Sequence, residues 1–79
     1  SDHYPSTLTS NARRALYDNL NKNESLALAI DREILSTKKD SWRGNRIKER
    51  EVRYAIKKHL KDDSLIDDIF EIVKKQNEY

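Results

Sequence analysis

Residues 10–37 read SNARRALYDNLNKNESLALAIDREILST, and the spacing of their apolar side chains decides the fold. In the first half, apolar residues recur at three- and four-residue intervals, which predicts a helix over residues 11–20 with Ser10 as its N-cap. The second half repeats this pattern and predicts a helix over residues 24–37, capped by Asn23. So short a link between two helices predicts that they pack against each other as an antiparallel pair.

Two further helices follow toward the C-terminal side. Apolar periodicity predicts them over residues 46–60 and 64–76, with Asn45 as a cap of the first and Asp62 among the residues that can cap the second. The chain has one Gly and one Pro, so it has little with which to build hairpin turns, and a multi-stranded β fold is improbable. The predicted fold is all-α, a small four-helix bundle-like domain.

The chain of 79 residues is short enough for one domain at most. Residues 1–9 contain hydroxyl side chains and no sustained periodicity, so we expect a linker or a frayed end there, and a single helical domain over residues 10–79. The chain contains no Met. Because a translated chain begins with Met, we expect this sequence to be a fragment of a longer polypeptide.

The helix predicted over residues 24–37 has an unusually broad apolar surface, covering about 200° of the helical wheel. Its members are Leu26, Ala27, Leu28, Ile30, Ile34 and Leu35. We therefore expect this helix to be the central one. Asp31 falls inside the apolar arc, where an unpaired carboxylate would cost several kcal/mol. It therefore requires an arginine or backbone donors, from the predicted first helix or from the loop at residues 42–45; the alternative role is that of a catalytic acid.

The loop before the third helix contains the chain's sole Trp and sole Gly, in the run Trp42-Arg43-Gly44-Asn45. An indole there is suited to anchoring the loop on the bundle. Gly44 is suited to a backbone conformation that residues with a Cβ resist. We interpret Trp42, Gly44, Asn45 and the paired Asp31 as structural anchors, with direct contact to a partner as the alternative for the tryptophan loop.

The third helix carries the most uneven charge, since residues 43–61 hold eight basic and two acidic side chains although the net charge of the whole chain is only +2. Five of these basic residues fall within about 80° on one face of the helix. They are Arg46, Arg50, Arg53, Lys57 and Lys61, which we call the basic stripe. Three interpretations stay open: a solvated helix face, a surface that follows nucleic-acid phosphates, or a docking surface for an acidic protein.

No pattern in the sequence predicts catalysis or a bound cofactor. The chain has no Cys, and its two His lack neighbouring ligands at metal-binding spacing, so a metal site is not expected. A phosphate-binding loop needs several glycines, and the usual metal-dependent nuclease triad needs an acidic residue two positions before a Lys; neither is present. We also find no signal peptide and no apolar run long enough to span a membrane, which favours an intracellular location.

Several short runs together resemble the C-terminal region of the R (restriction) subunit of type I restriction-modification enzymes. The similarity covers about residues 11–79, and its most specific part is the spacing from Asp31 to Trp42-Arg43-Gly44-Asn45 and on to Lys48. The other runs are Ala15-Leu16-Tyr17-Asp18-Asn19-Leu20, Asn23-Glu24, Leu26-Ala27-Leu28, Lys48-Glu49-Arg50-Glu51-Val52, Ala55-Ile56 and Gln76-Asn77-Glu78-Tyr79.

The resemblance implies a parent that is an ATP-driven DNA translocase and site-specific endonuclease, using ATP and Mg²⁺ in domains that lie elsewhere in the chain. Such a subunit assembles with modification (M) and specificity (S) subunits, and the resemblance implies a cytoplasmic, bacterial or archaeal setting. The expected function of the present domain is non-catalytic: it docks the R subunit onto the M and S subunits. The alternatives are a DNA-contacting module that uses the basic stripe and, more distantly, a helical nucleic-acid binder unrelated to restriction.

Overall fold

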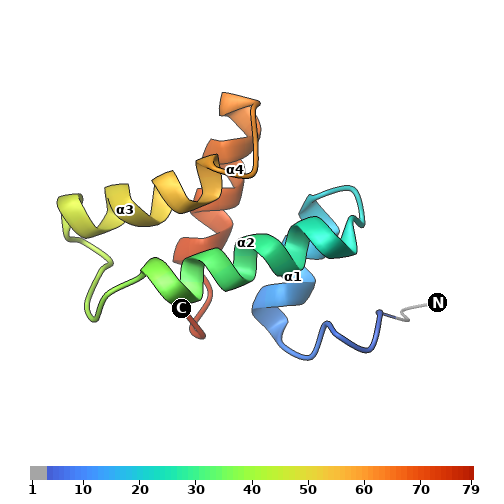
Figure 1. Ribbon diagram of the computed structural model, residues 1–79. Coiled ribbons are helices and arrows are strands. Elements are labelled where there is room, and N and C mark those ends of the chain that lie inside the picture. Colours follow the sequence, from blue (N-terminus) through green and yellow to red (C-terminus); the bar gives the residue numbers. More distant parts are fainter. Residues whose placement is uncertain (1–3) are drawn as a thin grey trace.

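A computed structural model describes residues 4–79, and over this range it contains four α-helices and no β-strand. The helices are α1 (Asn11–Asn19), α2 (Glu24–Thr37), α3 (Arg46–Lys57) and α4 (Asp63–Lys74). Figure 1 shows them gathered into one small bundle. The predicted all-α, four-helix bundle-like fold is confirmed.

Each helix begins at a residue whose side chain accepts a hydrogen bond from the backbone of the first turn. The four N-caps are Ser10, Asn23, Asn45 and Asp62. Each cap oxygen binds an N–H two or three residues further on, which satisfies a donor that has no partner inside the helix. The starts of the helices therefore lie within one residue of the predicted positions.

The helices contact one another in a closed order, because α1 packs on α2, α2 on α3, α3 on α4, and α4 on α1. Figure 1 shows α3 running alongside α2 in the opposite direction, while α4 crosses them. Helix α2, which was predicted to be central, has the most extensive contacts with its neighbours. The link from α1 to α2 turns through Asn21 and Lys22, both with positive φ.

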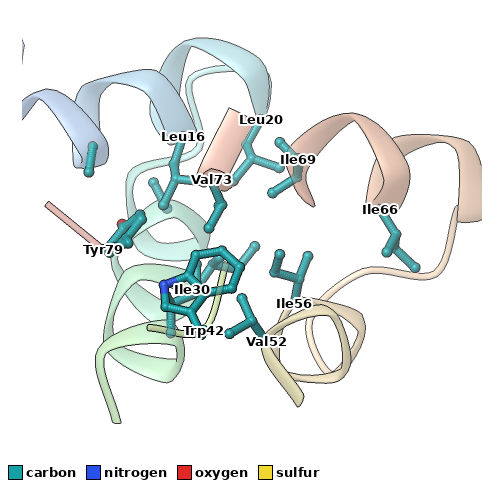
Figure 2. Packing of buried hydrophobic residues seen from close by; sticks show 13 residues of the cluster. Leu16, Leu20, Ile30, Trp42, Val52, Ile56, Ile66, Ile69, Val73 and Tyr79 are labelled. Carbon is teal, nitrogen blue, oxygen red and sulfur yellow. The ribbon is translucent and has the colours of Figure 1, made fainter. Parts of the chain in front are cut away.

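One continuous cluster of apolar side chains fills the space between the helices. All four helices contribute, and so do three residues outside them, Leu20, Trp42 and Tyr79. Figure 2 shows this cluster, with the Trp42 indole among the isoleucines and valines of the helices. Its largest helical members with no exposed surface are Leu16, Ile30, Ile34, Val52, Ile56, Ile69 and Val73. Burial of these side chains stabilises the fold by about 1.5–3 kcal/mol each.

Residues 4–9 lie against the helices, which differs from the linker or frayed end expected for residues 1–9. Leu8 is only 1% exposed, and its N–H donates to the Pro5 carbonyl at 2.9 Å. The Thr7 hydroxyl donates to the Glu24 carboxylate at the start of α2. A single leucine among hydroxyl residues gives no periodic signal, so sequence reasoning overlooked it. Residues 1–3, which share that expectation, lie outside the described residues.

The apolar arc of α2 is buried only in part. Ala27, Ile30 and Ile34 lie in the core, but Leu28 is half-buried and Leu35 is 49% exposed. The edge of α2 that carries Leu28 and Leu35 borders a surface hollow instead of another helix. The arc of α2 that packs in the core is therefore narrower than predicted.

Candidate functional site

Asp31 is buried in α2 and has two side-chain partners from distant parts of the chain. Its Oδ2 accepts a hydrogen bond from Arg13 Nε of α1 at 2.9 Å, and its Oδ1 accepts one from the Tyr79 hydroxyl at 2.5 Å. An arginine of the first helix is one of the partners that the sequence left open, whereas the tyrosine was not among them. Together the three side chains form what we call the Asp31 cluster.

The Asp31 cluster links α1 and α2 to Tyr79. Burial and the hydrogen bond to Asp31 raise the pKa of Tyr79 far above its ordinary value, so the phenol keeps its proton and remains a donor. Arg13 is held in turn, since its guanidinium also donates to the Thr7 carbonyl at 2.9 Å. Both carboxylate oxygens of Asp31 therefore have side-chain partners, as the structural-anchor interpretation requires.

The tryptophan loop anchors the bundle through Trp42, which is 2% exposed and packs against Phe70 of α4 with ring centroids 6.3 Å apart. The Arg43 guanidinium lies over the indole, 4.9 Å from the ring centroid. Gly44 has φ +81, which only a residue without a Cβ adopts freely, and its N–H donates to Glu49 Oε2 at 2.7 Å. These contacts agree with the interpretation of the loop residues as structural anchors.

Arg43 makes a contact that sequence reasoning missed. Its guanidinium donates to three backbone carbonyls at and beyond the last residue of α4: those of Lys74 at 2.7 Å, of Tyr79 at 3.1 Å and of Gln76. These carbonyls lack helical partners, and a cation near a helix C-terminus also interacts favourably with the helix dipole. Arg43 therefore binds the segment that carries Tyr79 to the tryptophan loop.

The basic stripe divides into paired and unpaired members. Arg53 is half-buried and forms an ion pair with Asp67 of α4. The other four, Arg46, Arg50, Lys57 and Lys61, are exposed, and none forms an ion pair within residues 4–79. Arg46 and Arg50 thus form a free pair on the first turns of α3, and Arg53 separates them from Lys57, the last residue of the helix. Lys61 lies four residues beyond the end of α3 and not on the helix face predicted from the sequence.

An apolar edge, formed by Ile47 and Tyr54, lies beside the basic stripe and was missed by sequence reasoning. Ile47 is 71% exposed and Tyr54 is 61% exposed, the largest values among the bulky apolar side chains of the described residues. Both line a hollow of about 490 Å³ between α3 and the end of α2, together with Ser36 and Arg50. A helical wheel of α3 places Ile47 and Tyr54 outside the buried arc, so this edge could have been found from the sequence.

A second ionic cluster joins α2 to the end of α3. Glu33 contacts His59 Nε2 at 3.2 Å through one oxygen, and its other oxygen accepts a hydrogen bond from Lys58 Nζ at 3.2 Å. The hydrogen bond from His59, followed by that from Lys58, lowers the pKa of Glu33 below its ordinary value of 4.5. These contacts fasten the C-terminal end of α3 to the middle of α2.

Within residues 4–79, no three His, Cys, Asp or Glu side chains come together in a way that could hold a metal ion. None of the helices described here has both the length and the apolar character needed to cross a bilayer. Comparison of the chain with protein-family models, with curated proteins and with solved structures found no match.

Proposed function

We propose that this domain is a non-catalytic docking domain of a type I restriction R subunit, which holds the ATP-dependent translocase and endonuclease on the M and S subunits. The residue pattern that resembles this family supports the proposal. Three of its parts, far apart in the sequence, contact each other: Asp31 binds Tyr79, and Arg43 binds the backbone of Gln76 and Tyr79. In the proposal, the residues of this pattern hold the helices together, and the exposed surface of α3 contacts the partner.

The observation that carries the docking function is the exposure of Ile47 and Tyr54 between free cations. Bulky apolar side chains that stay in water gain free energy when a partner covers them, and an isoleucine and a tyrosine beside arginines are typical of interface centres. ATP and Mg²⁺ have no role at this surface in the proposal, since they would serve the motor and nuclease domains of the parent.

The test is a binding titration of the 79-residue chain against the cognate M–S complex, with the full R subunit as competitor. We expect saturable binding that the R subunit displaces. The double substitution Ile47→Ala/Tyr54→Ala should weaken binding about tenfold or more, since interface anchors of this kind contribute more than 1 kcal/mol each. Absence of binding, or binding that the R subunit does not displace, would contradict the proposed function.

A second candidate is the DNA-contacting module, because Arg46, Arg50, Lys57 and Lys61 are exposed and have no carboxylate partner within the described part of the chain. Such a surface should bind duplex DNA with a logarithmic salt slope that falls by about 0.9 for each phosphate contact removed. Charge reversal of these four residues should then abolish duplex binding and leave M–S binding intact. The opposite result, loss of M–S binding with duplex binding unchanged, supports docking.

A further inference from the structure

The hollow beside the apolar edge has two chemically different walls. Toward α2, Lys39 Nζ and Glu51 Oε1 pair at 2.9 Å, so their charges offset each other. Toward the outer face of α3, Arg50 lines the hollow and Arg46 lies one turn earlier on the basic stripe, and neither has an ion-pair partner within residues 4–79. An occupant of the hollow therefore meets apolar side chains in the middle, a neutral wall on one side and a cationic wall on the other.

Arg46 occupies a position that local stability does not favour. It is the first residue of α3, where the helix dipole is positive and an acidic side chain would be stabilising. A cation there is unfavourable, and Arg46 itself forms no ion pair within residues 4–79, although Glu49 also lies in the first turn of α3. An anionic group brought by a partner would relieve this repulsion, and it would reach Arg50 on the next turn as well.

Two other occupants fit the hollow less well. A nucleic acid lying along the basic stripe would meet Arg53 in its middle, which is paired with Asp67, and the exposed apolar side chain of Ile47, which cannot bind a phosphate. A second copy of the chain could bring the exposed acidic side chains of α4, which are Asp63, Asp67, Asp68 and Glu71. However, the bulky apolar side chains that are exposed in residues 4–79 are Leu35, Ile47 and Tyr54, so the α4 face brings charge without an apolar anchor.

We infer that the hollow between α2 and α3 binds an acidic, apolar-anchored segment of a partner protein. Its apolar side chains cover Ile47 and Tyr54, and its carboxylates face Arg46 and Arg50. Ile47 and Tyr54 are seven residues apart, so the anchors span about 10 Å, two turns of a helix. The inference rests on the proposed docking function and names the surface and the chemistry of the segment that it receives.

The experiment titrates the ¹⁵N-labelled chain with a synthetic amphipathic peptide of about 16 residues, with glutamates on one side and two leucines spaced by two turns on the other. We expect chemical-shift changes confined to residues 36–39 and 46–54. Ile47→Ala/Tyr54→Ala should weaken binding about tenfold and Arg46→Gln/Arg50→Gln about fivefold. The matched variant Lys57→Gln/Lys61→Gln removes the same charge at the other end of the stripe and should change affinity by less than about twofold.

Four outcomes would overturn the inference. The first two are failure of the peptide to bind and equal binding by a scrambled peptide of the same composition. The third is that a DNA duplex binds more tightly than the peptide, with an affinity that the arginine and lysine variants reduce equally. The fourth is self-association of the chain through Ile47 and Tyr54. All substituted residues are exposed, so folding should persist, and the amide spectrum of each variant checks it.

The same variants separate this inference from the proposed function. If the cognate M–S complex binds the Ile47→Ala/Tyr54→Ala variant as well as the unchanged chain, the hollow is not its docking site, although the docking function stands. If the peptide binds as expected but the M–S complex does not bind the chain, the proposed function fails and the hollow remains a site for an acidic segment.

Discussion

At the scale of single residues, Asp31 shows how a buried carboxylate can organise a small domain. Its two oxygens are held by Arg13 from α1 and by Tyr79, which lies 48 residues further along the chain. A buried charge is tolerated only when its partners are in place, so a conformation that misplaces either side chain is penalised. The free-energy cost of burying Asp31 thus disfavours every arrangement of the helices in which one of its partners is missing.

Tyr79→Phe tests this role. The substitution removes the donor to Asp31 Oδ1 and leaves a buried carboxylate oxygen without its partner, so the free energy of unfolding should fall by about 1–3 kcal/mol. Urea denaturation followed by circular dichroism measures the change. Tyr54→Phe is the matched control, because that tyrosine is 61% exposed, and its stability should be unchanged. Equal stability of the two variants would show that the hydrogen bond contributes nothing.

Gly44→Ala tests the loop conformation. At φ +81 an added Cβ is strained, yet it would meet no atom within 4 Å, so the cost is confined to the backbone at about 1–2 kcal/mol. The control is Asn21→Gly, at φ 58, which relieves a left-handed residue and should leave the melting temperature unchanged or raise it. A Gly44→Ala variant as stable as the unchanged chain would contradict the assigned role of Gly44.

Prediction at single residues succeeded where the residue type and its neighbours in the sequence were enough to indicate the environment. Asp31 in an apolar arc required a partner, and Gly44 before a helix required an unusual backbone conformation. Prediction failed for Tyr79 and Leu8, which are buried by contacts with distant segments. Neither residue sits in a periodic pattern, and no local property of a chain end or a hydroxyl-rich stretch indicates which core it joins.

At the scale of helices, the ends were harder to place than the beginnings. The caps at Ser10, Asn23, Asn45 and Asp62 are encoded by side-chain type, so the four starts were predictable. Helix α3 ends at Lys57, three residues earlier than predicted. There the His59 N–H donates to the Ile56 carbonyl and the Leu60 N–H to the Lys57 carbonyl, so the chain tightens into turns with no glycine or proline to mark the change.

Arg43→Ala tests the cap of α4. Loss of the three carbonyl contacts and of the packing over Trp42 should lower the free energy of unfolding by about 1–3 kcal/mol. Hydrogen exchange should accelerate first in residues 74–79. Arg50→Ala is the control with the same change of charge: this side chain is exposed and has no ion-pair partner in the described structure, so stability should shift by less than about 0.5 kcal/mol.

At the scale of the whole molecule, the contacts of Glu33 with His59 and Lys58 predict how the stability of the fold depends on pH. The pKa of Glu33 is lower in the folded chain than its ordinary value of 4.5, so its contacts with His59 and Lys58 stabilise the fold above pH 4.5. This contribution is lost as the pH falls from 4.5 through the folded pKa. In thermal melts from about pH 2 to pH 7, the melting temperature of Glu33→Gln should fall less steeply toward acid pH than that of the unchanged chain.

Glu71→Gln is the matched control for the pH experiment, because Glu71 is exposed and has only a Lys74 contact at 3.8 Å on its own helix. Its melts should follow those of the unchanged chain at every pH. If Glu33→Gln instead declines as steeply as the unchanged chain, the link between α2 and the end of α3 does not depend on the charge of Glu33.

The attachment of residues 74–79 has a consequence for the order of events during synthesis. Arg43 binds backbone carbonyls, and Asp31 binds the Tyr79 hydroxyl, in residues that are translated more than 30 residues later. The Ala12 N–H likewise donates to Glu78, which lies 66 residues further along the chain. Helices α1 to α3 can form as they leave the ribosome, but Asp31 stays without one of its partners until Tyr79 emerges. We therefore expect ribosome-bound chains to acquire protease resistance in a single late step, after Tyr79 has cleared the exit tunnel.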